Sequence, residues 1–296
     1  MRILDRIIPI IGAASGQSAN QLGCEKAPAL IESLLRAGSK SSQEKSADWS
    51  RFMWQETITC TTSLRQLAAL PAVADFCLQL ATFTQKLATQ YPQLLVMGGD
   101  HAVAMGTWSG IVQAYAPRGP LGLIWVDAHL DSHTPDDTES GNIHGMPLAS
   151  LLGQGDVLLT QILSPKPKFK PQHVVVIGAR SYEPVEVERL QSLGVRVYWM
   201  RDIERLGIAA IFTEAVEYLT ATTVGIGMSI DLDAFDPHDV PAVSAPEPHG
   251  IFLGSFLAAT NVLKSLVALE ITEFNPTLPG SEQTAQAVLQ LMNRLL

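Results

Sequence analysis

Four short segments of the sequence place acidic residues or histidines directly after a run of apolar residues. They are Gly-Gly-Asp-His at 98–101, Asp-Ala-His-Leu-Asp-Ser-His at 127–133, Asp-Leu-Asp-Ala-Phe-Asp at 231–236 and Glu-Phe-Asn-Pro at 273–276. Carboxylates and imidazoles bind divalent cations, and both groups transfer protons when their pKa values suit the reaction. The segments therefore predict a metal site with acid–base groups around it.

The spacing within two of these segments predicts that their polar side chains act together. Asp127, His129 and Asp131 are two positions apart, so in an extended chain they point to one face. Asp231 and Asp233 share a face in the same way. Taken alone, Gly-Gly-Asp marks a turn before a helix, and Asp-x-Asp caps a helix or pairs with Arg. Three potential metal ligands on one face of an apolar strand end are not explained by packing.

The combined ligand set indicates which metal the site takes. His101 adds a second imidazole to the four carboxylates and His129. Such an oxygen-rich set with two nitrogens suits Mn²⁺ rather than a metal that prefers thiolates. Four formal negative charges balance two divalent cations, and without metal the carboxylates would repel each other and their pKa values would rise.

Continuous apolar runs alternate with amphipathic segments of helical length along the chain. Unbroken runs are typical of strands buried on both faces of a parallel sheet, so the alternation predicts an α/β layered fold. Ligand sites in such sheets lie beyond the carboxyl ends of the strands, where the four polar segments occur. The expected strands are 7–12, 57–60, 94–99, 121–127, 174–180, 195–200, 224–233 and 266–272, and the expected helices include 28–38, 76–90, 187–194, 209–220 and 281–296. We expect surface loops at 39–50 and 163–172.

Composition excludes several classes of function. The chain has 296 residues, of which 47% are hydrophobic, and a net charge of −9. We expect one domain over 1–296. The acidic balance and the lack of a Lys/Arg cluster argue against nucleic-acid or anionic-membrane partners. We find neither a signal peptide nor an apolar stretch of about 20 residues, and therefore expect a cytoplasmic protein. Cys24, Cys60 and Cys77 lack metal-site spacing and are predicted to be buried, reduced thiols.

The motifs resemble those of the arginase/agmatinase (ureohydrolase) family. GGDHA, DAHLD, SGNIHGMP, SIDLDAFDP and EFNP occur in that family's order and approximate spacing, and residues 11–38 resemble its opening strand, loop and first helix. The resemblance implies a three-layer α/β/α fold with a mostly parallel sheet of about eight strands. It also implies trimers or hexamers and two Mn²⁺ ions per subunit. The implied metal ligands are His101, Asp127, His129, Asp131, Asp231 and Asp233.

The resemblance also implies the reaction, which is hydrolysis of a guanidino group by a hydroxide that bridges the two metals. Asp131 would orient the hydroxide, besides binding metal. His144 would donate a proton to the leaving amine, because its ordinary pKa lies near neutrality. Glu273 would pair with the guanidinium and aim it at the nucleophile.

Loop length favours arginase within the family, with L-arginine cleaved to L-ornithine and urea. Thr138 and Ser140 match the positions where arginases contact the amino-acid carboxylate, and Asn142 is also expected to bind substrate. Two further substrate positions depart from the arginase pattern, since His133 replaces an Asn, and Glu183 replaces an Asp that meets the α-ammonium.

These departures leave alternatives open. Asp136 and Asp137 on the same loop would also work against an anionic substrate tail. Agmatine, guanidinobutyrate and an N-formimino amino acid remain candidate substrates. A non-catalytic, metal-bound binding protein and a metal-dependent deacetylase are the alternatives from other classes.

Overall fold

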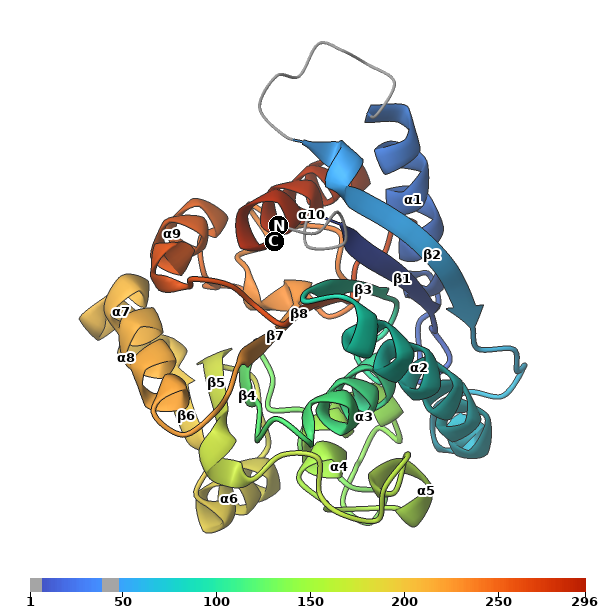
Figure 1. Cartoon of the computed structure of the whole chain (residues 1–296). Helices are drawn as coiled ribbons and strands as arrows, with labels where there is room; N and C mark the ends of the chain where they lie inside the picture. Colours follow the sequence, from blue (N-terminus) through green and yellow to red (C-terminus); the bar gives the residue numbers. More distant parts are fainter. Residues whose placement is uncertain (1–6, 39–47) are drawn as a thin grey trace.

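Eight parallel strands form one sheet, which is the middle layer of the structure (Figure 1). The computed structural model describes residues 7–38 and 48–296. Every strand pair is parallel, in the order β2-β1-β3-β8-β7-β4-β5-β6. The strands are β1 (Ile8–Ala14), β2 (Phe52–Thr59), β3 (Leu94–Gly98), β4 (Gly122–Val126), β5 (Val174–Ala179), β6 (Arg196–Trp199), β7 (Ile226–Asp231) and β8 (Ala268–Thr272).

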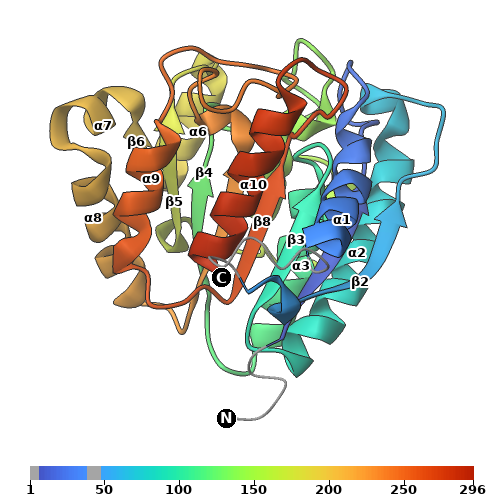
Figure 2. The same ribbon diagram turned by 90° about the horizontal axis from the view of Figure 1, so that it is seen from above.

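Helices cover both faces of the sheet, as the two views show (Figures 1 and 2). One face carries α1 (Ala27–Gly38), α7 (Met200–Leu206), α8 (Ile208–Thr220), α9 (Leu253–Ala259) and α10 (Ser281–Leu295). The other carries α2 (Leu70–Gln90), α3 (Val103–Tyr115), α4 (Pro147–Leu151), α5 (Val157–Thr160) and α6 (Pro184–Leu193). The expected three-layer α/β/α architecture is confirmed.

Successive residues of each central strand serve different cores, which explains the unbroken apolar runs. In β3, Leu95 and Met97 pack with the α1 side, whereas Leu94 and Val96 pack with the α2 and α3 side. All four are fully buried. A strand between two helical layers has no solvent face, so it needs no polar residue at alternate positions.

The strand order brings the four polar segments together. β3, β8, β7 and β4 are adjacent at the centre of the sheet. Because all strands run in the same direction, the residues that follow them lie at one edge. These residues are the polar segments at 98–101, 273–276, 231–236 and 127–133.

Several elements differ from the sequence expectation. β2 begins at Phe52 rather than at residue 57, because an edge strand tolerates polar, partly exposed positions such as Gln55 and Glu56 that break the apolar run. α3 was not among the expected helices, since nearly all of its residues are buried and it has no polar stripe. Most of the loop expected at 39–50 lies outside the described residues.

The loop at 163–172 is confirmed as irregular, but one of its lysines is not solvated. Lys168 is buried, and its Nζ donates to the backbone carbonyls of Thr160, Ser164 and Lys166. The lysine therefore closes the loop on itself. Burial lowers the pKa of this amine to about 8.

One helical stretch, Gln66–Gln90, is long and apolar enough to cross a membrane by length and composition. The sequence analysis found no such stretch, because scattered polar residues interrupt it. Half of its most apolar window is buried within the fold, where Val73, Phe76 and Leu80 join the core beside α3. These contacts are those of a core helix. The three cysteines are buried and free, as expected.

The close packing of α2 against α3 depends on glycine, which gives a stability prediction. A Cβ on Gly110 would clash with the Ala81 carbonyl oxygen and Thr84 Oγ1, whereas Gly254 in α9 has open space around its Cβ position. We expect Gly110→Ala to lower the free energy of unfolding by about 1–3 kcal/mol through overpacking. Gly254→Ala, the matched control, should raise it by roughly 0.5 kcal/mol through lower chain entropy. Urea denaturation of both variants checks this, and a shift in the same direction for both would contradict it.

Candidate active site

His101 lies at the centre of one group of carboxylates. Its Nδ1 is 3.3 Å from Asp127 Oδ2, 2.9 Å from Asp131 Oδ2 and 3.1 Å from Asp231 Oδ2. All four residues are buried, and their ligand atoms could hold one metal ion. His101 follows β3, Asp127 and Asp131 follow β4, and Asp231 is the last residue of β7. These three strands lie in the central part of the sheet.

A second group shares Asp127 with the first. His129 Nδ1 lies 3.1 Å from Asp233 Oδ2 and 3.5 Å from Asp127 Oδ1. These three residues could hold another ion. Asp127 therefore faces the first group with one carboxylate oxygen and the second group with the other, which is the arrangement that a bridging ligand requires. The structure brings all six predicted metal ligands together.

Turns, rather than extended strands, bring the ligands into position. β4 ends at Val126, and Asp131 adopts a positive φ of 46°. Asp233 lies in a 3-10 turn that follows β7. The expectation that residues 127–131 are extended was therefore wrong.

Side-chain-to-backbone hydrogen bonds explain these turns. The His129 N–H donates to Asp127 Oδ1 at 2.7 Å, and the Asp233 N–H donates to Asp231 Oδ1 at 2.9 Å. Aspartate commonly accepts from the backbone two residues on and so closes a turn. Each such bond pulls the chain back toward the carboxylate, so residues two positions apart still converge.

A buried network fixes the orientation of His101. Its Nε2 is 2.9 Å from Ser229 Oγ, and that hydroxyl donates to Glu270 Oε1 at 2.7 Å. The hydroxyl has one hydrogen, so it accepts from the imidazole Nε2–H. In the neutral ring, Nδ1 then carries a lone pair directed at the carboxylates. Trp125 stacks on the ring and donates to Asp127 Oδ2.

The electrostatics of the cluster fit divalent metal ions. His101 Nδ1 and Asp131 Oδ2 are buried, and neither has a hydrogen-bond partner among the described residues. Burial and the neighbouring Asp127 charge raise the pKa of Asp131 to about 6, and burial and Asp233 also raise the pKa of Asp231. A lone pair facing several carboxylates is repulsive unless positive charge lies between them, and accordingly, although burial lowers the pKa of His101, these carboxylates raise it. The donor set of carboxylate oxygens and imidazole nitrogens suits such cations.

Glu273 and His144 form an ion pair beside this cluster. His144 Nδ1 is 3.0 Å from Glu273 Oε1, which also accepts from the His101 N–H at 2.7 Å. Glu273 has a positive φ of 64°, and the Cys24 thiol donates to its Oε2. Burial lowers the pKa of His144, but the Glu273 charge outweighs burial and raises it to about 9. His144 is therefore an imidazolium at neutral pH in this environment.

A cavity of about 200 Å³ connects the carboxylate cluster to the surface. Asp131, Asp231 and Asp233 line its inner part, and His144 also borders it. Of the predicted substrate-binding residues, His133, Ser140, Asn142 and Glu183 line it. Thr138 does not line it, but its Oγ1 lies 3.4 Å from Ser140 Oγ. The structure thus places most predicted site residues around one cavity.

Sequence reasoning missed three polar residues of the site. Glu186 lines the cavity and is buried, while Ser229 and Glu270 support His101. A signal existed for each of them. Glu186 lies three positions after Glu183, the spacing of a capping box, and it accepts from the Glu183 N–H. Ser229 and Glu270 are polar residues within otherwise apolar strand sequences.

Arg180, which no sequence pattern singled out as functional, holds the loops around the second ligand group. Its guanidinium donates to the carbonyl oxygens of Asp233, Ala234 and Glu247, and also to those of Gly178 and Pro248. These bonds tie the 3-10 turn after β7 to the following loop. Glu247 Oε1 lies 3.7 Å from His129 Nε2.

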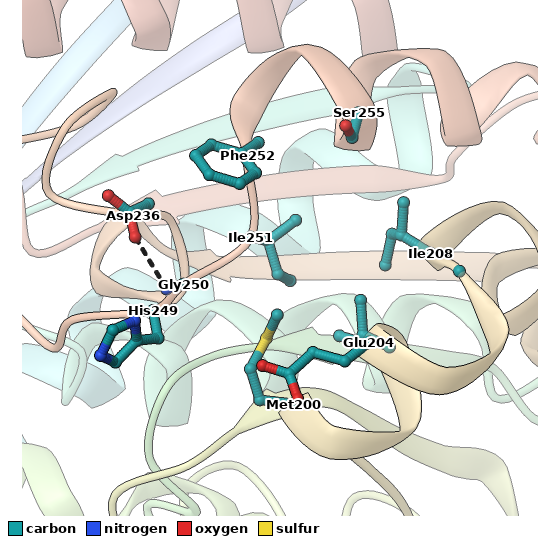
Figure 3. A pocket seen from close by; sticks show the side chains of 11 residues that line it. Met200, Glu204, Ile208, Asp236, His249, Gly250, Ile251, Phe252 and Ser255 are labelled. Atoms are coloured by element: carbon teal, nitrogen blue, oxygen red, sulfur yellow. Dashed lines mark hydrogen bonds between the residues drawn. The ribbon is translucent and has the colours of Figure 1, made fainter.

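A larger cavity of about 440 Å³ lies elsewhere, between α7, α8 and the segment that leads into α9 (Figure 3). Met200, Ile208, Ile251 and Phe252 form apolar walls. None of the six predicted metal ligands lines it. His249, which the sequence did not assign, borders this cavity rather than the carboxylate cluster. The candidate active site is therefore identified by the metal-binding and titratable residues that line the smaller cavity, and not by cavity volume.

Comparisons with known proteins agree with this geometry. The model of the arginase family matches residues 7–296. An arginase from Bacillus caldovelox is 39% identical over 233 residues, which cover 78% of this chain and 77% of the relative. The solved structure of arginase from that organism has a TM-score of 0.88 and 32% identity, with 98% of each chain covered. Formimidoylglutamase from Bacillus subtilis, at 22% identity and a TM-score of 0.80 over 98% of this chain and 86% of that one, shares the fold.

The ion pair between His144 and Glu273 predicts a pH-dependent contribution to stability. The pKa of His144 in the folded protein is about 9, above the ordinary histidine value of 6.5. The ion pair therefore stabilises the fold fully below pH 6.5 and loses this effect as the pH rises through 9. His144→Asn keeps a donor but cannot carry charge. In metal-free protein, we expect the variant's deficit in unfolding free energy to shrink by about 3 kcal/mol between about pH 6 and about pH 10. Urea denaturation at both pH values measures it, and a constant deficit would refute the ion pair.

Proposed function

Because the chain belongs to the arginase family, we propose that it hydrolyses L-arginine to L-ornithine and urea with two Mn²⁺ ions per subunit. The family membership makes it an amidinohydrolase. The observation that carries the proposal is the pair of ligand groups that share Asp127. Such a pair fits a binuclear, metal-dependent amidinohydrolase.

The ligand chemistry supports manganese as the metal. Asp127, Asp131, Asp231 and Asp233 contribute hard oxygens, and the two histidines contribute nitrogens, with no cysteine near enough to join either group. Two bound divalent cations supply a nucleophile at neutral pH by lowering the pKa of water, and they polarise the group under attack.

Glu273 and His144 suit the two remaining tasks of the reaction. A guanidinium is a delocalised cation, and a buried carboxylate such as Glu273 can bind and orient it through charge-assisted hydrogen bonds. His144 uses Nδ1 to contact Glu273, which leaves Nε2 for the substrate. As an imidazolium, it can give its Nε2 proton to the amine that leaves when the carbon–nitrogen bond breaks.

The outer part of the cavity supports an amino-acid head group. Asn142 Oδ1 accepts from Gln66 Nε2, which leaves the amide nitrogen of Asn142 as a donor. The hydroxyls of Thr138 and Ser140 accept from backbone N–H groups and can donate to a carboxylate. Glu183 provides the negative charge that an α-ammonium requires.

We propose the remaining properties from the sequence, the oligomeric state from the family resemblance and the others from length and composition. The chain forms one domain, assembles into trimers or hexamers and functions in the cytoplasm. Its partner is a small-molecule guanidino substrate rather than nucleic acid or a membrane. The acidic net charge of −9 agrees with that choice.

Urea release by manganese-loaded protein tests the proposed function. The substrate panel comprises L-arginine, agmatine and 4-guanidinobutyrate, with formamide release followed for N-formimino-L-glutamate. We expect L-arginine to give the highest kcat/KM, and metal removal with a chelator to abolish turnover until Mn²⁺ is restored. If the protein hydrolysed only one of the other compounds, that compound would replace L-arginine as the proposed substrate. Absence of turnover with two metals bound would support the non-catalytic binding protein instead.

A further inference from the structure

His133 has both ring nitrogens directed at carboxylates of its own chain. Nδ1 lies 2.9 Å from Asp137 Oδ1. Nε2 lies 2.9 Å from Glu183 Oε2 and 3.5 Å from Glu186 Oε2. An imidazole has two nitrogens, so the ring keeps no N–H for a carboxylate of the substrate.

Two of the three carboxylates around His133 are held firmly by other groups. Asp137 accepts from the Thr134 N–H and hydroxyl and forms an ion pair with Arg189. Glu186 accepts from the Ser132 N–H at 3.0 Å and from the Glu183 N–H at 3.1 Å, and its side chain is only 3% exposed. Both carboxylates are therefore held in place, and Glu186 also lines the cavity.

Glu183 is held less firmly than these two carboxylates, although its side chain also joins a capping box with Glu186 at the start of α6. Its side chain is 58% exposed, and the Oε2 contact with His133 ties it to the cavity wall. A mobile glutamate loses rotamer entropy when it binds a ligand, and a carboxylate already held in place loses less. His133 thus links the fixed Asp137 to the exposed Glu183, across the cavity that ends at the metal ligands.

We infer that His133 is a positioning residue that aims Glu183 at the ammonium group of the substrate and does not itself bind the substrate carboxylate. The inference rests on the proposed function and narrows its substrate class to guanidino compounds with a primary ammonium at the far end. Near that end lie the carboxylates of Asp137, Glu183 and Glu186, in contact with the imidazole of His133 and, at Asp137, with the guanidinium of Arg189. The donors that the 138–142 loop offers to a substrate carboxylate, the hydroxyls of Thr138 and Ser140, are uncharged.

The inference predicts a different effect of His133 on three probe substrates. L-arginine has both ammonium and carboxylate, agmatine has only the ammonium, and 4-guanidinobutyrate has only the carboxylate. A residue that acts through Glu183 affects the first two probes. A residue that bound the carboxylate directly would affect the first and third. Agmatine therefore separates the two mechanisms.

Two substitutions at His133 divide the contacts of the imidazole. His133→Asn places its amide near the position of Nδ1, so it can still reach Asp137 but not Glu183. His133→Gln places its amide near the position of Nε2 and is the conservative rescue variant. We expect His133→Asn to raise KM about tenfold for L-arginine and agmatine with kcat changed less than about twofold, and to leave 4-guanidinobutyrate no worse. His133→Gln should restore most of the preference for the ammonium substrates.

A double-mutant cycle tests whether His133 acts through Glu183. Glu183→Gln alone should lower the preference for ammonium substrates. When His133→Asn is added to Glu183→Gln, it should have little further effect on KM. Glu188→Gln is the matched control, because it removes a carboxylate charge from an exposed residue of α6, the helix that follows Glu183. It should change each KM by less than about twofold.

Several results would overturn the inference. One is an equal loss on all three probes, which would indicate a purely structural role. Another is a loss on L-arginine and 4-guanidinobutyrate that spares agmatine, which would indicate direct contact with the carboxylate. If wild-type protein bound three equivalents of metal and His133→Asn bound only two, Nε2 of His133 would be a metal ligand instead. Wild-type protein that hydrolyses none of the probes would refute the proposed function and, with it, this inference.

Discussion

Negative charge concentrated in a buried volume is the constraint on which the active-site end of this structure depends. Four aspartates and two histidines meet where burial removes most of the stabilisation that water gives to an ion. The cost of burying each ionised carboxylate is on the order of several kcal/mol unless cations or hydrogen bonds compensate. The local backbone supplies part of that compensation, because N–H groups at Ala128, His129 and Asp233 donate to the aspartates. Two divalent cations would supply the rest.

The same constraint explains why the support around the site is polar and buried. Ser229, itself bonded to Glu270, holds Nε2 of His101. This contact directs the other ring nitrogen, Nδ1, at the aspartates. Glu270 in turn accepts from the indole of Trp108. Partners of this kind fix the tautomer and ring orientation of a metal-binding histidine. The strands thus contribute to the chemistry through their interior residues as well as through their ends.

The sequence predicted the layers of the fold and the location of the site for physical reasons that can be traced to particular residues. Apolar runs such as 94–99 have no polar alternation, because helices cover both sides of the sheet. The polar segments follow four such runs, and parallel strands place their carboxyl ends together. Neither inference needs the exact backbone, so both could be made without coordinates.

Other features depended on backbone or tertiary detail that the sequence does not express. Asp131 joins the cluster through a positive φ in a turn, where an extended chain had been expected. Glu186 had a capping-box spacing, but only the folded loop shows that it faces His133. The edge strand β2 has half-exposed residues, so hydrophobic pattern alone located its start incorrectly. The partners of His133 lie up to about 50 residues away in sequence, and no local pattern could pair them.

The central claim is that Asp127 joins two cation sites by offering one oxygen to each ligand group. Electron paramagnetic resonance of metal-free protein titrated with Mn²⁺ tests it most directly, because two ions that share a ligand are magnetically coupled. We expect the spectrum of a coupled pair to grow up to two equivalents of Mn²⁺, and Asp127→Asn to lose the coupling. Signals of isolated Mn²⁺ at two equivalents, or saturation at a single equivalent, would contradict it.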